Sequence, residues 1–380
     1  MSDPVIVIGS GPAGLATAAE LVARDVPVTV LERGPDPASA WARRYDSLRF
    51  NTSRRLSALP GAPFPRSFGQ FPTRDQYVSY LRDYARTRGV PVRTGVEVTQ
   101  VRPGTATRWT LATPAGDIGA DQVVVATGLY SRPVLPAWAT AGDFGGEVLH
   151  SSDYRNPGPF RGRRVLVVGA GSTGLEIAGE LARGGAAEVM LSVRRPPVIL
   201  YRRLGGLPVD LPVPLFLRLP PAAVDRMLLR LQRLVVGDLT AYGIDAPQEG
   251  PLTALMRRGA GTAIVDREVV DAVREGLVRV VPAVQGLERD GARLTNGRLL
   301  PVGAVVAATG LDTGLRPLVG DLDVLDERGV PRDGTGAEVL PGLRFVGYVY
   351  RPGLTGYAGV LARRVAREIA ATRIRQPQAA

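Results

Sequence analysis

Two stretches of the sequence repeat one pattern: an apolar strand, a glycine-rich turn and an amphipathic helix. They are VIVIGSGPAGLATAAEL (Val5 to Leu21) and VLVVGAGSTGLEIAGEL (Val165 to Leu181). The pattern is typical of a nucleotide-binding unit, in which the helix begins directly at the phosphate-binding turn. The two copies lie 160 residues apart, which is too far for a solenoid repeat. Two separate nucleotide-binding units are therefore predicted.

Apolar runs alternate with helical patterns through the rest of the chain, as in parallel sheets covered by helices on both faces. The expected strands include VPVTVLE, DQVVVATG, AEVMLSV, VRVVPAV, AVVAATG and LRFVGY. The expected helices include residues 74–87, 222–236 and 359–371. The predicted fold class is α/β, with two Rossmann-like doubly wound domains.

The second domain is predicted to be inserted into the first. Two strands end in the same tripeptide, ATG, at Gly128 and Gly310, and we expect the chain to cross between the domains near these glycines. Both glycines are also predicted to bind the cofactors. The first domain is placed at residues 1–155 and 300–380, and the second at residues 156–299, with errors of a few residues at each boundary.

Composition excludes several classes of protein. The net charge is +11, but all 47 basic residues are arginine, and they are spread along the chain without the aromatic interleaving of a nucleic-acid surface. A nucleic-acid partner is therefore not expected. The sequence has no cysteine, which excludes disulfides, thiolate metal sites and a C-x-x-C redox pair. No signal peptide is evident, and no apolar stretch reaches the roughly 18 residues of a membrane span. A cytoplasmic protein is expected.

The first glycine turn carries Gly9, Gly11 and Gly14 in the pattern G-x-G-x-x-G. The first glycine allows the tight turn, the second lets the backbone approach a pyrophosphate, and the third lets the helix pack close to the sheet. Eighteen residues after Gly14, Glu32 closes a strand, where its carboxylate can accept hydrogen bonds from the hydroxyls of an unphosphorylated ribose. Glu32 and the neighbouring Arg33 are therefore predicted to bind FAD.

The second glycine turn repeats this spacing but has no acidic residue at the position that corresponds to Glu32. A serine occupies that position, and two arginines follow closely. Guanidinium groups suit a charged 2′-phosphate, so the second turn is predicted to bind NADP(H). The predicted residues of this site are Gly169, Gly171, Ser172, Thr173, Gly174, Ser192, Arg194 and Arg195.

Just before the second turn, the segment FGGEVLHSSDY fits the pattern F-x-G-x-x-x-H-x-x-x-Y. This segment resembles the identifying motif of class B flavin-dependent monooxygenases, in the flavin-containing monooxygenase branch. The likeness covers nearly the whole chain and is strongest to YUCCA-type enzymes and their bacterial relatives, in segments such as WARRYDSLRFNTS and LRFVGYVYRPGLTGYAG. The resemblance implies FAD, NADPH and molecular oxygen, a flavin C4a-hydroperoxide, and insertion of one oxygen atom into a small organic substrate.

The resemblance also suggests roles for individual residues. Asn51, in LRFNTS, is similar to an asparagine that faces the flavin, and it is the predicted catalytic residue. Trp41 and Arg44 are expected to cover the pyrophosphate and adenosine parts of FAD. Leu354 and Thr355 precede a helix whose positive N-terminal end would face the flavin. The sequence there, TGYAGVLA, lacks the aspartate that YUCCA-type proteins usually have soon after the glycine.

Other interpretations stay open at this point. His150 is the only histidine, and the resemblance makes it a structural residue near the cofactor rather than a catalytic base. Residues 208–243 are predicted to be a helical insertion in the second domain, which either packs over the active-site cleft or touches a membrane surface. Asp225 and Gln232, which dilute a cationic face, favour the first. The alternative functions are a flavin-dependent NADPH oxidase or reductase and a non-catalytic nucleotide-sensing flavoprotein. A homodimer is also open, and no metal site is expected.

Overall fold

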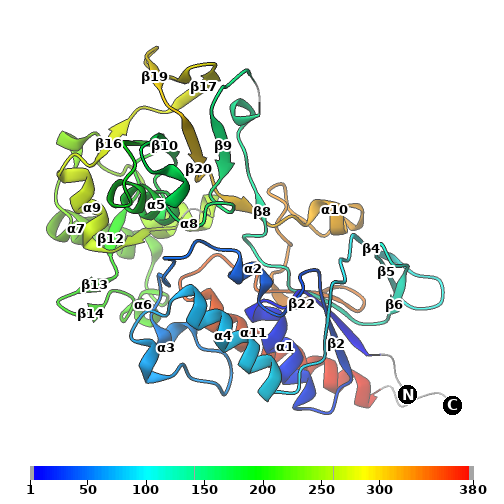
Figure 1. The fold of residues 1–380 in the computed structure, drawn as a ribbon. Coiled ribbons are helices and arrows are strands. Elements are labelled where there is room, and N and C mark those ends of the chain that lie inside the picture. Colours follow the sequence, from blue (N-terminus) through cyan, green and yellow to red (C-terminus); the bar gives the residue numbers. More distant parts are fainter. Residues whose placement is uncertain (1–3, 141, 260, 376–380) are drawn as a thin grey trace. The chain divides into compact units, whose positions relative to one another are not determined.

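The computed structural model describes residues 4–140, 142–259 and 261–375 (Figure 1). The chain forms two compact units, each made of segments that are distant in the sequence. Unit 1 comprises Met1–Arg43, Ser53–Arg132 and Leu311–Ala380, and unit 2 comprises Arg44–Thr52 and Pro133–Gly310. Which cofactor each unit holds, and the cofactor-domain boundaries expected at 155 and 300, stay predictions.

Unit 1 is built on a six-stranded sheet with the strand order β22-β23-β7-β1-β2-β3. The pairs β1–β2, β2–β3, β1–β7 and β7–β23 are parallel, and β22 is antiparallel to β23. The strands are β1 (Val5–Ile8), β2 (Val28–Glu32), β3 (Val92–Thr94), β7 (Val123–Val125), β22 (Thr335–Leu340) and β23 (Leu343–Val346). The residues of β1, β7 and β23 are all buried, as expected for the central strands of a parallel sheet that is covered on both faces.

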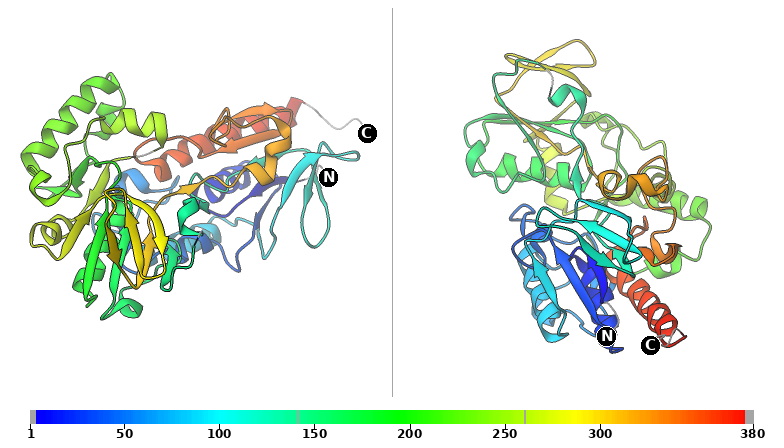
Figure 2. Two further views of the ribbon diagram at one scale, coloured as in Figure 1. Left: turned by 90° about the horizontal axis from the view of Figure 1, so that it is seen from above. Right: turned by 90° about the vertical axis from the view of Figure 1, so that its right-hand side faces the viewer.

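Three long helices belong to unit 1. Helix α1 (Pro12–Val22) packs along α11 (Leu354–Arg375), and the two are seen close together in both views of Figure 2. Helix α4 (Arg74–Thr87) begins with a capping box, in which the side chains of Thr73 and Gln76 each accept from the other's backbone N–H. A small antiparallel sheet of β4 (Gln100–Pro103), β5 (Trp109–Ala112) and β6 (Ile118–Ala120) completes the unit.

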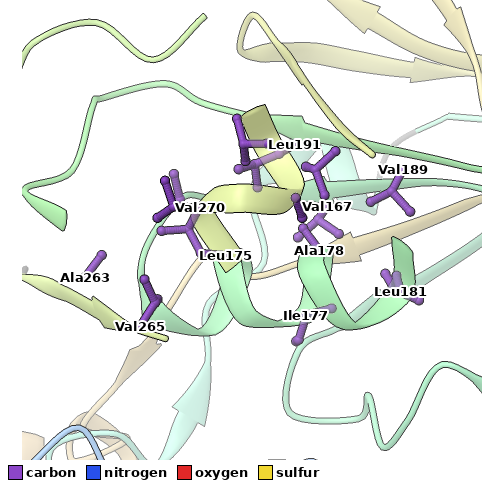
Figure 3. Packing of buried hydrophobic residues seen from close by; sticks show 14 of the residues in the cluster. Val167, Leu175, Ile177, Ala178, Leu181, Val189, Leu191, Ala263, Val265 and Val270 are labelled. Carbon is purple, nitrogen blue, oxygen red and sulfur yellow. The ribbon is translucent and has the colours of Figure 1, made fainter. Parts of the chain in front are cut away.

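Unit 2 has a five-stranded parallel sheet with the order β16-β11-β10-β20-β9. Figure 3 shows its core, in which Leu175 and Leu181 of α5 lie against Val167 and Leu191 of the sheet. The elements are β9 (Glu147–His150), β10 (Arg164–Val168), α5 (Ser172–Arg183), β11 (Glu188–Ser192), α9 (Arg267–Arg274), β16 (Val278–Val281) and β20 (Ala304–Ala307). A second, antiparallel sheet consists of β17 (Val284–Glu288), β18 (Gly291–Leu294) and β19 (Leu299–Pro301).

The segment between β11 and α9 adds further strands and helices to unit 2. It contains β12 (Ile199–Tyr201), β13 (Arg203–Leu204), β14 (Leu207–Pro208), α6 (Val213–Phe216), α7 (Pro221–Val235), α8 (Pro251–Arg258) and β15 (Ala263–Val265). Strands β12 and β15 pair in parallel, and residues of both belong to the same buried cluster as the main sheet. The short elements elsewhere are α2 (Ser39–Ala42), α3 (Arg54–Ser57), β8 (Arg132–Pro133), β21 (Leu311–Asp312) and α10 (Arg316–Val319). Among the described residues, no helix combines the length and hydropathy that crossing a bilayer requires.

The predicted fold class is confirmed, since each unit has a largely parallel sheet with helices. The helix expected at 74–87 is α4, and the one expected at 222–236 is α7, displaced by one residue. The helix expected at 359–371 begins earlier, at Leu354, because the glycines of LTGYAG do not interrupt it. Residues Arg44–Thr52 belong to unit 2, although the segments before and after them belong to unit 1. The sequence patterns did not indicate this.

Two polar residues of α7 correct one argument made from the sequence. Asp225 and Gln232 are both buried. The carboxylate of Asp225 accepts from the backbone N–H groups of Leu252 and Thr253, at the start of α8, and Gln232 Oε1 accepts from the backbone N–H of Ile199. Neither residue dilutes an exposed cationic face, so the reason for preferring a cleft-covering role for residues 208–243 is wrong. Both interpretations of that segment stay open.

Candidate functional site

In the first glycine turn, Gly9 and Gly14 are each required for a steric reason, whereas Gly11 faces open space. Gly9 has a φ of +101°, and a Cβ there would lie 2.8 Å from the carbonyl oxygen of Ala126. A Cβ on Gly14 would lie 1.9 Å from the carbonyl oxygen of Gly9, so only glycine allows α1 to approach the turn so closely. Around Gly11, in contrast, nothing lies within 4 Å of a Cβ position.

The second turn reproduces this geometry in unit 2. Gly169 has a φ of +114° and lies against Ala308, where a Cβ would be 2.4 Å from the carbonyl oxygen. A Cβ on Gly174 would lie 1.8 Å from the carbonyl oxygen of Gly169, and a Cβ on Gly171 would again meet nothing within 4 Å. Each turn therefore leaves open the place where the backbone meets a ligand, at the N-terminus of the following helix. Both turns fit a dinucleotide pyrophosphate. We call the turn of Gly9, Gly11 and Gly14 the first cradle and the turn of Gly169, Gly171 and Gly174 the second cradle.

Glu32 is connected directly to the first turn. Its carboxylate is buried and accepts hydrogen bonds from the backbone N–H of Ser10 at 3.0 Å and from the Ser10 hydroxyl at 2.6 Å. The other carboxylate oxygen accepts from the backbone N–H of Gly34 at 2.7 Å. Carboxylate oxygens accept more than one hydrogen bond each, so Glu32 retains capacity for ribose hydroxyls. The neighbouring Arg33 is exposed.

At the end of β11, which corresponds to the position of Glu32 in unit 1, the side chains differ in whether they are free to bind a ligand. The Ser192 hydroxyl is buried and donates to the carbonyl oxygen of Pro282 at 2.9 Å, so it is already used within the protein. Arg194 and Arg195 are exposed and have no hydrogen-bond or ion-pair partner in the described part of the chain. In α5, the Ser172 hydroxyl accepts from the backbone N–H of Ile264 at 3.0 Å, and Thr173 is half-buried.

Four further predicted residues lie in unit 1. Trp41 is half-buried and meets Tyr77 edge to face, with ring centroids 4.6 Å apart. Gly128 has a φ of +93°, and its backbone N–H donates to the Tyr348 hydroxyl at 3.3 Å. Leu354 and Thr355 are the first residues of α11 rather than preceding it, so the helix N-terminus lies earlier than predicted, at Leu354. Gly310, with a φ of +95°, lies at the end of unit 2.

The other two predicted residues, Arg44 and Asn51, lie in the segment 44–52, which belongs to unit 2. Burial lowers the pKa of the Arg44 guanidinium, and the Arg44 carbonyl oxygen accepts from Arg155 at 3.1 Å. The Asn51 side chain is half-buried, and its Oδ1 accepts from Arg202 at 3.2 Å. The cofactor-binding and catalytic roles of these residues stay predictions.

Arg202 was not among the predicted residues, and in the structure it is only 3% exposed. Its guanidinium forms ion pairs with Glu176 of α5 and with Asp266, the residue before α9. Burial raises the pKa of Glu176, although the nearby Arg202 opposes this shift. Glu176 follows the second glycine turn by two residues, but nothing in the sequence distinguishes Arg202 from the many surface arginines.

His150 has both ring nitrogens engaged within unit 2. Nε2 lies 3.0 Å from the carbonyl oxygen of Gly310, to which it must donate, because a carbonyl only accepts. Nδ1 then accepts from the backbone N–H of Ser152 at 3.1 Å. Burial lowers the pKa of His150, which favours this neutral form. With no ring nitrogen free, the arrangement supports the structural role expected for His150.

Comparison with known proteins gives matches over most of the chain. The family model described as pyridine nucleotide-disulphide oxidoreductase matches residues 6–199. The indole-3-pyruvate monooxygenase YUCCA1 of Oryza sativa subsp. japonica is 36% identical over 309 residues, which are 80% of this chain and 76% of that protein. The probable indole-3-pyruvate monooxygenase YUCCA3 of Arabidopsis thaliana is 33% identical over 97% of this chain and 87% of its own length.

Solved structures share the fold at lower identity. A flavin-containing monooxygenase from Stenotrophomonas maltophilia has a TM-score of 0.71 at 23% identity, over 98% of this chain and 99% of that one. The structure of OTEMO in complex with FAD and NADP has a TM-score of 0.74 at 18% identity, over 98% of this chain and 84% of the other. At these identities the likeness establishes the fold alone.

Substitution of single glycines separates ligand binding from folding. Gly11→Ala places a methyl group in open space, so we expect the protein to keep its Tm but to bind FAD at least about tenfold more weakly, since the methyl group blocks the pyrophosphate. Gly14→Ala collides with the carbonyl of Gly9 and should lower the Tm. The measurements are thermal unfolding of the apoprotein and FAD titration by fluorescence. Unchanged FAD affinity in Gly11→Ala would refute the proposed cradle.

The lowered pKa of His150 predicts a pH-dependent contribution to stability. Because the folded-state pKa lies below the usual 6.5, the unfolded chain takes up the proton first as the pH falls. The contribution of His150 is therefore present above about pH 6.5 and declines below it, towards the folded-state pKa. The stability difference between the wild type and His150→Gln, measured by urea denaturation, should shrink between pH 7.5 and pH 5.5 on this argument. A difference that grows as the pH falls would contradict it.

Proposed function

Because the chain belongs to the flavin-dependent monooxygenase family of its YUCCA relatives, we propose that it transfers one oxygen atom from molecular oxygen to a small organic substrate, with FAD and NADPH as cofactors. The observation that carries this proposal is the pair of matching glycine cradles with opposite charges beside them. Glu32 stands at the first cradle, and Arg194 and Arg195 follow the strand beside the second.

The first cradle is assigned to FAD. The open space at Gly11 admits the pyrophosphate, and the N–H groups at the start of α1 donate to it. Glu32, held by Ser10 and Gly34, accepts hydrogen bonds from the adenosine ribose. A negative charge at this place disfavours a 2′-phosphate, which is consistent with FAD rather than NADP at this cradle.

The second cradle is assigned to NADPH. Arg194 and Arg195 are exposed without protein partners in the described part of the chain, so they can pair with a 2′-phosphate without first breaking other contacts. Paired guanidinium groups bind phosphate through charge-assisted hydrogen bonds, which contribute about 1.5–3 kcal/mol each. The Ser192 hydroxyl donates to the carbonyl oxygen of Pro282, so it holds the end of β11 in place rather than binding the ligand.

FAD and NADPH, when bound, would supply the redox chemistry, which is hydride transfer and the activation of molecular oxygen. The protein supplies binding, orientation and a hydrogen-bond donor. The carboxamide of Asn51 has its NH2 group unpaired with any described residue, and we assign it as the donor to the reacting oxygen. The matched family description includes disulphide reduction, but a chain without cysteine cannot perform dithiol chemistry.

The experiment that tests this function is a substrate panel with the purified holoenzyme. The panel includes indole-3-pyruvate, on which the named relatives act, together with amines and sulfides. For at least one compound, we expect oxygenated product to account for most of the NADPH consumed. Hydrogen peroxide as the only product for every compound would instead assign the chain as an NADPH oxidase.

The double variant Arg194→Gln/Arg195→Gln tests the assignment of the second cradle. Loss of the pairing with the 2′-phosphate should raise the KM for NADPH on the order of tenfold to a hundredfold, while the KM for NADH changes little. Arg289→Gln, an exposed arginine of the same unit, is the matched control and should leave both values unchanged. Equal changes for NADPH and NADH would contradict the assignment.

A further inference from the structure

A buried arginine, Arg202, contacts the segment 44–52, which contains Asn51, within unit 2. Arg202 directly follows β12 and lies 150 residues beyond this segment in the sequence. Its Nε donates to the carbonyl oxygen of Phe50 at 3.1 Å, and Nη2 lies 3.4 Å from the carbonyl oxygen of Arg49 and 3.2 Å from Asn51 Oδ1. One guanidinium thus contacts three consecutive residues of the chain.

The other side of the guanidinium is held by two carboxylates. Nη1 donates to Asp266 Oδ2 at 2.5 Å, and Nη2 donates to Glu176 Oε1. The second oxygen of Glu176 accepts from the hydroxyl of Tyr45, which is buried and also lies in the segment 44–52. The position of Arg202 is therefore fixed by α5, the helix that starts at the second glycine turn, and by the start of α9.

The chemistry of arginine determines the orientation of the Asn51 side chain. A guanidinium has N–H donors and no acceptor, so the atom of the carboxamide that faces it must be the oxygen. The NH2 group then points away from Arg202. No described residue accepts from that NH2 group, which leaves two donors of defined direction beside a fixed backbone.

We propose that Arg202 is a positioning residue for the oxygen-transfer reaction: its guanidinium fixes the Asn51 carboxamide with the NH2 group directed towards the reacting oxygen. This inference rests on the proposed function, in which Asn51 is the donor. Because Arg202 also pairs with Glu176, the same contacts connect the helix of the second cradle to the donor. Arg202 itself contacts neither substrate nor cofactor in this account.

Arg202→Lys is the informative substitution. It keeps the positive charge, so the largely buried Glu176 and the partly exposed Asp266 still have a cationic partner. A single ammonium group cannot reproduce the fork of donors that reaches the carboxylates, the Phe50 carbonyl and the Asn51 oxygen together. The matched control is Arg344→Lys in unit 1, since Arg344 is equally buried and also pairs with two carboxylates, Glu338 and Glu368.

Two measurements on the holoenzyme test the proposal. Hydrogen exchange followed by mass spectrometry reports on the backbone of residues 44–52, and we expect Arg202→Lys to speed its exchange by roughly tenfold, because hydrogen bonds to a charged group are lost. The amount of oxygenated product per NADPH should fall by the same factor in Arg202→Lys as in Asn51→Ala. The double variant should be no worse than either single variant, because both changes remove one positioned donor.

Arg344→Lys should lower the Tm without changing the exchange of residues 44–52 or the product yield. The proposal is overturned if Arg202→Lys retains the wild-type yield while Asn51→Ala loses it, or if the two losses multiply in the double variant. Unchanged exchange of residues 44–52 in Arg202→Lys also overturns it, whatever the activity. A wild type that makes no oxygenated product refutes the proposed function instead, and the exchange measurement still decides whether Arg202 holds the segment.

Discussion

The close approach of two helices to two glycine turns is the constraint on which the structure depends. In each unit the third glycine of the turn lies so near the carbonyl of the first that a Cβ would be 1.9 Å or 1.8 Å from its oxygen. This contact places the start of the helix directly beyond the end of the central strand. The second glycine is left facing open space, and the N–H groups of the helix point into it. The buried strands and helices on either side hold this geometry in place.

The two cradles are alike in backbone and different in side chains, and this difference is what the proposed function uses. Glu32 is part of the first turn through its hydrogen bonds to Ser10, so its charge is fixed close to a ligand. Arg194 and Arg195 are exposed and have no hydrogen-bond or ion-pair partner in the described part of the chain. A preorganised carboxylate and two unengaged cations suit two different ribose groups. We propose that one backbone design thereby serves two cofactors.

The sequence predicted those parts of the structure that depend on local patterns. The glycine spacings, the apolar strands and the helix at 74–87 follow from residues close together in the chain, and the structure has all of them. It did not predict that residues 44–52 belong to unit 2, since their partners lie more than 100 residues away. Arg202 and the buried Asp225 and Gln232 were missed or misjudged for a different reason. Polar residues in an arginine-rich sequence do not reveal by pattern which of them are buried and paired.

The most direct test of this account is the flavin content of the purified wild-type protein, measured from its visible spectrum and by chromatography of the cofactor released on denaturation. We expect a yellow protein with one FAD for each chain, bound at the first cradle by Gly11 and Glu32. A colourless protein that takes up no FAD when reconstituted would contradict it, and the assignment of both cradles would then fail.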